Sequence, residues 1–258
     1  MRFALLADIH GNSIALDAVL EDVRSRGGTD GYLFLGDLAA MGPDPIGVLE
    51  RATSLEGARF VRGNTDRYIV TGERPDWYRR DASHSESDLR RLDLAIATSL
   101  AWTQGVVTAA GWYDWLAALP SDLRIELPDG TRLLAVHASH RRDDDPSLRP
   151  TASDDELREL LADAGADLVC AGHTHRAMDR RLGPKLRVVN PGSLSNPLPS
   201  EPEIRAGYAL LDARVDGYTV ELHRVDYDHD AFAESLRRVH HPEADRLIGL
   251  QRGSEPVR

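Results

Sequence analysis

Short apolar runs alternate with amphipathic segments through the first sixty residues of the chain. The runs Phe3–Ala7, Tyr32–Leu35 and Arg59–Arg62 have the length and composition of β-strands. Between them, Ser13–Arg26 and Ile46–Glu56 place apolar residues at helical spacing. This order predicts a βαβαβ unit, whose crossovers bring the loops that follow the strands to one edge of the sheet.

The pattern changes after residue 68. Residues 71–84 are rich in Pro, Arg, Asp and Ser and are predicted as a loop, and helical spacing returns over Asp88–Ser99 and Ala109–Leu119. We therefore predict a helical insert over residues 71–120. Three tryptophans are expected to pin this insert onto the body of the protein: Trp102, Trp112 and Trp115.

The second half of the chain is richer in strands. Leu123–Leu127 and Thr131–Val136 flank Pro128-Asp129-Gly130, a turn sequence that predicts a hairpin. Helices are predicted over Asp154–Ala164 and Asp230–Val239. Four further runs are predicted as strands: Leu168–Ala171, Leu186–Val189, Tyr208–Leu211 and Tyr218–Val225.

These elements predict an α/β (α+β) fold. Mixed strands and helices with a terminal antiparallel hairpin favour a four-layer αββα sandwich, in which two mixed sheets pack face to face and are flanked by helices. No Pro/Gly/Ser linker or charge block divides the chain. We therefore expect one domain over residues 1–245, followed by a polar C-terminal tail over residues 246–258.

Composition narrows the class of protein. No apolar run approaches the roughly 18 residues of a membrane helix, so we expect no membrane association. The first residues enter a strand without the features of an export signal, and Cys170 is the only cysteine, so a cytoplasmic location is expected. The formal charge of −11 disfavours a nucleic-acid partner and a nuclease activity. A small anionic substrate stays compatible, because divalent ions would make a cleft positive.

Polar residues with metal-ligand chemistry follow the strands. Asp8 and His10 come two apart after the first strand, which points both side chains the same way, and His173 and His175 repeat that spacing after a later one. Alone, the first pair fits a solvated turn better than a ligand pair. Its repetition at successive strand ends favours a site for two divalent ions. The candidate ligands are Asp8, His10, Asp37, Asn64, His137, His173 and His175.

The order of these motifs is Asp-x-His, Gly-Asp, Gly-Asn-x-Asp, His and Gly-His-x-His, between Asp8 and His175. In this the chain resembles the calcineurin-like metallophosphoesterases, and in particular their small bacterial, phosphodiesterase-like branch. Gly42–Pro45, Asn190–Ser193 and Val225–Asp228 extend the resemblance over nearly the whole chain.

The resemblance implies two ions and a hydrolytic reaction. A metal-bridging hydroxide would attack the phosphorus of a small phosphate ester in line with the leaving oxygen, on a diester more readily than on a monoester. The mixed N/O ligands suit Mn, which we favour, or Fe, Zn or Ni. The implied ligand sets are Asp8, His10 and His175 for one ion, Asn64, His137 and His173 for the other, and Asp37 as the bridge.

Thr65 departs from the family pattern, because a His follows the motif Asn in the best-known members. A Thr hydroxyl donates a hydrogen bond but is a poor general acid near pH 7, and such acid catalysis contributes roughly 10²- to 10⁴-fold in rate. A second hypothesis therefore stays open: a metal-binding docking, scaffold or sensor module of the same fold with little turnover.

Other residues are candidates for substrate contact or proton transfer. His140, three residues after His137, is a candidate acid, whereas His84 is more readily a solvated loop residue. Arg141 and Arg142 either bind a phosphate or leaving group, or pair with the neighbouring aspartates.

Two residues near the motifs have supporting roles in this hypothesis. Asn12 either caps the first helix or faces the substrate, and Asp66 is expected to orient the loop or a ligand His during catalysis. The aromatic residues Trp77, Tyr78, Trp112 and Trp115 fit either a cover over the site or a seam in a homo-oligomer, so the oligomeric state stays open.

Overall fold

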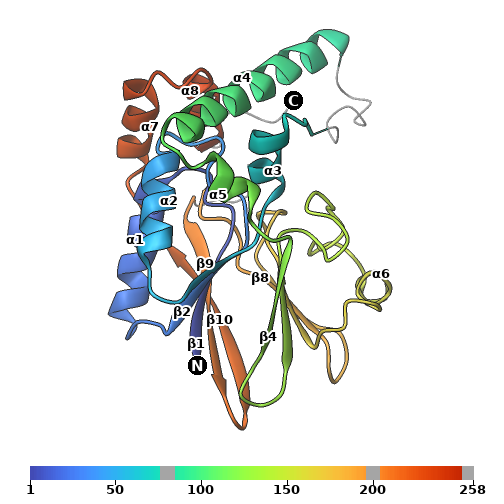
Figure 1. The fold of residues 1–258 in the computed structure, drawn as a ribbon. Coiled ribbons are helices and arrows are strands. Elements are labelled where there is room, and N and C mark those ends of the chain that lie inside the picture. The colour runs from blue at the N-terminus through green and yellow to red at the C-terminus, as the bar shows by residue number, and fades with distance from the viewer. Residues whose placement is uncertain (76–84, 196–203, 252–258) are drawn as a thin grey trace.

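The computed structural model describes residues 1–75, 85–195 and 204–251, which form two five-stranded sheets with helices around them (Figure 1). The first sheet has the strand order β10-β9-β1-β2-β3. Its strands are β1 (Arg2–Leu6), β2 (Gly31–Phe34), β3 (Ala58–Phe60), β9 (Ala206–Arg214) and β10 (Gly217–Val225). β1, β2 and β3 are parallel, and β9 is antiparallel to both of its neighbours.

The second sheet has the strand order β4-β5-β6-β8-β7. Its strands are β4 (Asp122–Glu126), β5 (Arg132–Val136), β6 (Leu168–Cys170), β7 (Met178–Arg181) and β8 (Arg187–Asn190). β5, β6 and β8 are parallel, whereas β4 and β7 are antiparallel edge strands. Both sheets are therefore mixed, as predicted.

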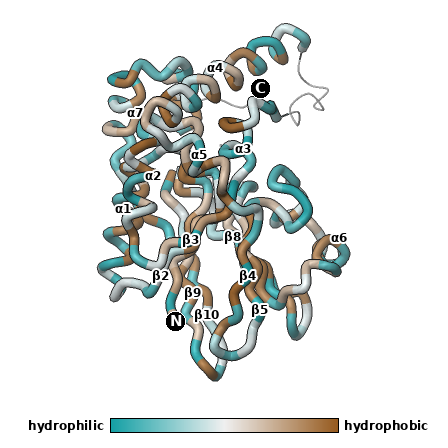
Figure 2. Tube along the Cα trace, in the orientation of Figure 1, coloured by the Kyte–Doolittle hydropathy of each residue, from teal (hydrophilic) through white to brown (hydrophobic). Residues whose placement is uncertain are grey.

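Alternation along the strands builds the layers. Leu5 and Leu133 face the other sheet, whereas their neighbours Leu6 and Leu134 face the helices. The inter-sheet layer is mostly apolar, with buried Arg187 over the ring of Tyr218, and Figure 2 shows hydrophobic residues concentrated on the central strands. Face-to-face sheets with helices outside confirm the predicted four-layer sandwich.

The helical covering is unequal on the two faces. The second sheet is covered by α6 (Asp154–Leu160) and the loop before it. Seven helices pack on the outer side of the first sheet or against one another above it (Figure 1). They are α1 (Ser13–Ser25), α2 (Pro45–Ser54), α3 (Asn64–Thr71), α4 (Glu86–Ala109), α5 (Tyr113–Ala117), α7 (His229–Arg238) and α8 (Ala244–Gln251). Within the described part of the chain, no helix is long and apolar enough to span a bilayer.

The structure corrects several predicted boundaries. The polar tail expected from residue 246 is wrong for its first part, because α8 buries Leu247 and Ile248 against the helical layer. α3 and β7 were not predicted: α3 begins inside a polar motif, and β7 is a polar edge strand. α4 is one helix that continues well beyond the predicted end at Ser99.

The helical insert packs as expected where it is described. Trp112 and Trp115 make an edge-to-face pair, with ring centroids 5.5 Å apart, and pack on the helical core. Trp102 makes a similar contact, at 4.6 Å, with His241 in the turn before α8. Most of the loop predicted over residues 71–84, including Trp77, Tyr78 and His84, lies outside the described residues.

His241 should make stability depend on pH. Its ring is buried and Nε2 has no hydrogen-bond partner in the part of the chain that the structure describes, and burial lowers the pKa to about 4, against 6.5 for an ordinary imidazole. The unfolded chain therefore binds a proton at higher pH than the folded chain, and stability is lost as the pH falls through this window. His241→Asn keeps an acceptor for the backbone N–H of Glu243.

We expect His241→Asn to flatten the loss of unfolding free energy between about pH 6.5 and pH 4 by up to about 3 kcal/mol. Urea titrations across this range would measure it. The matched control is His240→Asn, because His240 is exposed and has a left-handed backbone that Asn tolerates. Equal pH profiles for the two variants would contradict the assignment.

Candidate metal centre

The ends of five strands deliver the candidate ligands to one place, as the sequence predicts. Asp8 and His10 follow β1, Asp37 follows β2, His137 follows β5, and His173 and His175 follow β6. Asn64 opens α3 after β3. The ligand atoms form two groups, and within each group all of them lie within 4.8 Å of one another. The groups are Asp8, His10 and His175, and Asp8, Asp37 and His137.

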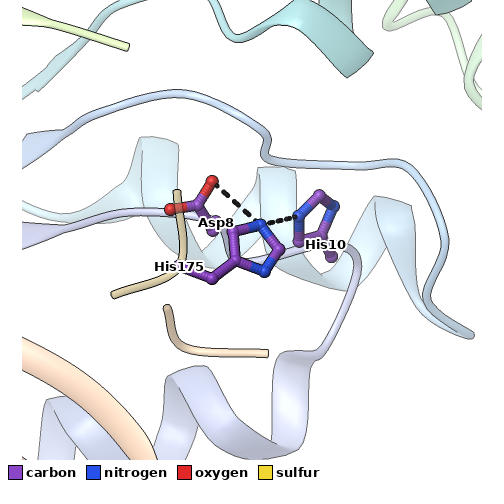
Figure 3. Close-up of side chains that lie close together, drawn as sticks. All are labelled: Asp8, His10 and His175. Atoms are coloured by element: carbon purple, nitrogen blue, oxygen red, sulfur yellow. Dashed lines mark hydrogen bonds and ion pairs between the residues drawn. The ribbon is translucent and has the colours of Figure 1, made fainter. Parts of the chain in front are cut away.

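The first group combines one carboxylate with two imidazoles. His175 Nε2 lies 3.4 Å from Asp8 Oδ1 and 3.3 Å from His10 Nε2, and Figure 3 shows the three side chains converging. His10 Nε2 is also 3.7 Å from Asp37 Oδ2. Imidazole nitrogens this close to each other and to a carboxylate are the arrangement that a shared cation stabilises.

His137 and Asn64 lie on the other side of Asp37 from His10. His137 Nε2 is 3.5 Å from Asp37 Oδ1 and 3.0 Å from Asn64 Oδ1. His137 Nδ1 donates a hydrogen bond to the carbonyl oxygen of Leu35 at 2.7 Å. This bond fixes the ring with Nε2 directed at the other ligands. The ring of His173 packs edge-on against His137, with centroids 5.1 Å apart. The two oxygens of Asp37 therefore face two different sets of ligands.

The backbone at these residues is unusual. Left-handed φ values are costly for residues with a side chain and cluster at functional sites. They persist here because hydrogen bonds fix the loops: Asp8 N donates to Gly36 O at 3.1 Å, and His10 N donates to Asp37 O at 2.9 Å. Five of the seven candidate ligands have positive φ: Asp8 (56°), His10 (48°), Asp37 (56°), His173 (66°) and His175 (56°).

Glycines allow the loops to approach this closely. A Cβ on Gly63 would lie 2.1 Å from Asp37 Oδ1, and one on Gly36 would lie 2.7 Å from His137 Nδ1. Gly36 also has a φ of 87°. The glycines of the Gly-Asp and Gly-Asn motifs are thus required by close backbone packing against the ligand side chains.

Asp66 ties two of the ligand loops together. Its fully buried carboxylate accepts hydrogen bonds from the backbone N–H groups of Asp37, Leu38 and Gly63, each at 2.9 Å. Burial and the charge of Asp37 raise the pKa of Asp66 to about 6. The residue orients the loops, as the sequence predicts, and has no direct route to a substrate because it is buried beneath them.

The end of β8 and the turn after it are hydrogen-bonded to the loops that carry the ligands. Asn190 Nδ2 donates to Gly172 O at 2.6 Å and to Thr174 Oγ1 at 3.1 Å, next to the two histidines of that loop. Ser193 Oγ donates to the backbone carbonyl of Asp8 at 3.0 Å. The Asn190–Ser193 segment therefore fixes the loops that carry ligands.

Electrostatics leave four of the candidate ligands, Asp8, Asp37, His10 and His173, in metal-binding protonation states. Burial alone would raise the pKa of Asp37 and of Asp8, but the neighbouring charges of His137 and His175 bring both below the ordinary value. Burial lowers the pKa of His10 and of His173 to about 4, so both imidazoles are neutral at pH 7. Carboxylates and neutral imidazoles are the forms that coordinate metals.

His137 behaves differently because it faces Asp37. Burial opposes its charged form, yet the Asp37 carboxylate raises the pKa of His137 to about 10. The Asp37 carboxylate thus favours positive charge on or beside His137, which either a proton or a metal cation would provide.

The residues present fit divalent ions. Carboxylate and carboxamide oxygens stand beside imidazole nitrogens, all nearly buried, and this mixed donor set suits Mn, Fe, Zn or Ni better than Ca. Asp8, His10 and His175 would hold one ion, and Asp37 and His137 form a second candidate group with Asp8.

Thr65 lies at the ligands without contributing a charge. Its backbone N–H donates to Asp37 Oδ1 at 2.8 Å, whereas its hydroxyl is buried and has no hydrogen-bond partner among the described residues. The structure therefore places Thr65 where the sequence predicts it, holding the carboxylate that faces both ligand sets.

The proposed substrate role of Asn12 is not supported. Asn12 is fully buried, its side-chain oxygen accepts from Ala15 N at 3.0 Å as the cap of α1, and its Nδ2 donates to Ser195 Oγ at 3.2 Å. Both ends of the side chain are thus committed within the protein. The alternative reading of Asn12 as a helix cap is the one that the structure shows.

His140, Arg141 and Arg142 are directed away from the ligands. His140 Nε2 lies 2.8 Å from Asp163 Oδ1, and Arg141 donates to the same oxygen at 2.8 Å. Arg142 Nε donates to Asp144 at 2.9 Å. All three line a neighbouring pocket rather than the ligand cleft. The catalytic role expected for His140 is therefore not supported, and the arginines pair locally.

A cleft of about 590 Å³ opens over the ligands, within the usual size of a small-molecule site. Several lining residues were missed by the sequence reasoning. Arg149 and Arg176 bring exposed cations to it, and Arg176 directly follows His175, which is the signal that could have identified it. Met41 lines the cleft with a left-handed backbone, for which the sequence offers no signal.

Fold and site define a class: α/β sandwich proteins with a metal-ligand cluster at the carboxyl ends of the strands. The profile of the calcineurin-like phosphoesterase superfamily domain matches residues 1–216, and the chain belongs to that superfamily. This confirms the resemblance seen in the motifs.

Three similar proteins illustrate the likeness. An uncharacterised protein of Methanocaldococcus jannaschii is 25% identical over 239 residues, 87% of each chain. The crystal structure of a hypothetical protein of Pyrococcus horikoshii matches with a TM-score of 0.78 and 22% identity over 97% of each chain. That of a metallophosphoesterase from Sphaerobacter thermophilus matches with 0.71 and 22% over 99% of each. These likenesses show the same fold.

Asp66→Asn should destabilise the protein through the ligand loops. The carboxamide nitrogen would face a backbone N–H, which leaves a buried donor unpaired, so we expect a loss of about 2–3 kcal/mol in unfolding free energy. Urea denaturation of the metal-free protein measures this. The control Asp216→Asn removes a carboxylate at an exposed turn and should change stability by less than about 0.5 kcal/mol. Similar losses in both variants would refute the role of Asp66.

Proposed function

We propose that this protein hydrolyses small phosphate esters with a pair of divalent ions, and phosphodiesters in preference to monoesters. The observation that carries the proposal is the position of Asp37, whose two oxygens face His10 on one side and His137 on the other. A carboxylate in this position can bridge two cations. We favour manganese, since the donor set mixes nitrogen and oxygen.

Divalent ions bound here would neutralise charge on phosphoryl oxygens and lower the pKa of a bound water from 15.7 toward about 7. The chain supplies the geometry. Thr65 N–H and the loop held by Asp66 fix the Asp37 carboxylate, and Leu35 O fixes the ring of His137. Asn64 provides a neutral oxygen, which keeps the site positive enough to attract an anion.

The preference for diesters is supported by what faces the cleft. Thr65 stands in place of a general acid, and His140 lines a different pocket. The leaving group must therefore depart without a proton from a side chain at either position. The cleft is also large enough for two organic groups. Activated diesters satisfy both conditions.

A metal-binding docking or sensor module is the second candidate. Thr65 favours it because a general acid is absent at this position. The helical insert favours it because it adds surface that hydrolysis at the metal ligands does not require. The complete ligand set counts against it, since a scaffold has no use for the left-handed backbone at five ligands. As part of the enzyme proposal, we also propose that the protein is cytoplasmic and that its substrate is a small molecule.

Turnover separates the two candidates. The Mn-loaded protein should hydrolyse an activated aryl phosphodiester faster than the matching monoester, and Asp37→Asn should reduce kcat/KM by more than about 100-fold, because a change even one step removed from a metal costs 10- to 100-fold. His140→Gln is the matched control and should stay close to wild type. Bound metal without turnover of either ester would favour the docking module, and faster monoester hydrolysis would overturn the diester preference.

A further inference from the structure

A small apolar pocket opens beside the ligands, between α3, α4 and α8. On α4, Leu92, Ile96, Ser99 and Leu100 line it at the spacing of one helix face, and Leu247 of α8 lies opposite. Its volume is about 130 Å³. The insert and the C-terminal helix thus form walls that the ligand motifs themselves do not provide.

This pocket adjoins the ligand cleft. Met41, Asn64 and Thr65 line both spaces, and Asn64 is a candidate metal ligand. A group that enters the pocket therefore starts within reach of the metal centre. The place is where one organic substituent of a bound phosphate ester would project.

Two hydroxyls in the pocket lack partners. Thr65 Oγ1 and Ser99 Oγ are buried, and neither makes a hydrogen bond to any described residue. Buried polar groups in native proteins are nearly always hydrogen-bonded, to protein or to a bound molecule. Among the described residues, the hydrogen-bonding capacity of these two hydroxyls is thus unused.

We propose that this pocket binds one uncharged aryl or short alkyl group of the ester and so determines substrate preference. The volume is close to that of the roughly 150 Å³ apolar cavity that accommodates benzene, and it is too small for a nucleoside. The inference rests on the proposed function for its substrate, but the pocket can be tested by binding alone.

The test compares two phosphonates that differ only in the group directed into the pocket. Calorimetry on the Mn-loaded protein should show phenylphosphonate binding roughly 10- to 100-fold more tightly than methylphosphonate, as expected for burial of a phenyl group. Ile96→Trp fills the pocket and should bring this ratio close to one, while methylphosphonate affinity stays unchanged. Leu92→Trp is a second filling variant in case the first fails to fold.

Leu94→Trp is the matched control, because Leu94 lies on the exposed face of the same helix, with 68% of its surface accessible. It should keep the wild-type ratio. A wild-type ratio near one, no binding of phenylphosphonate, or a ratio that survives in a folded filling variant would overturn the pocket assignment. Selective phenylphosphonate binding without hydrolysis of any ester would instead overturn the proposed function and leave the pocket assignment standing.

Discussion

The site depends on the backbone reversing direction directly after the strands. Asp8, Asp37 and three histidines adopt left-handed conformations there, which L-residues avoid unless surrounding contacts compensate. The compensation comes from backbone hydrogen bonds between neighbouring loops and from the buried carboxylate of Asp66. Glycines at positions 36 and 63 let those loops approach without a clash. Hydrogen bonds between the loops thus hold a strained arrangement of ligands in place.

Charge explains why such an arrangement needs cations. Asp8 and Asp37 are buried and ionised, and burying carboxylates is costly unless opposite charge is close. This environment raises the pKa of His137, whereas burial keeps His10 and His173 neutral. Divalent ions would add positive charge beside these carboxylates and accept lone pairs from the neutral imidazoles of His10 and His173.

The sequence predicted the ligands because they sit in short motifs at strand ends, where alternation and spacing are informative. Asp8, Asp37 and His137 meet as those motifs imply. Two contacts could not be predicted from the sequence: that of Asn12 with Ser195 and that of His140 with Asp163. Each joins side chains that lie far apart along the chain. β7 and α8 were missed for a related reason: polar edges and weakly periodic segments are stabilised by tertiary packing that local patterns do not record.

Asp37 as a bridge between two ions is the central claim. The most direct measurement is anomalous scattering at the manganese edge from a crystal of the Mn-loaded protein. The account predicts two peaks that share the Asp37 carboxylate, one among Asp8, His10 and His175 and the other among Asn64, His137 and His173. A single peak, or two peaks of which one does not contact Asp37, would contradict it.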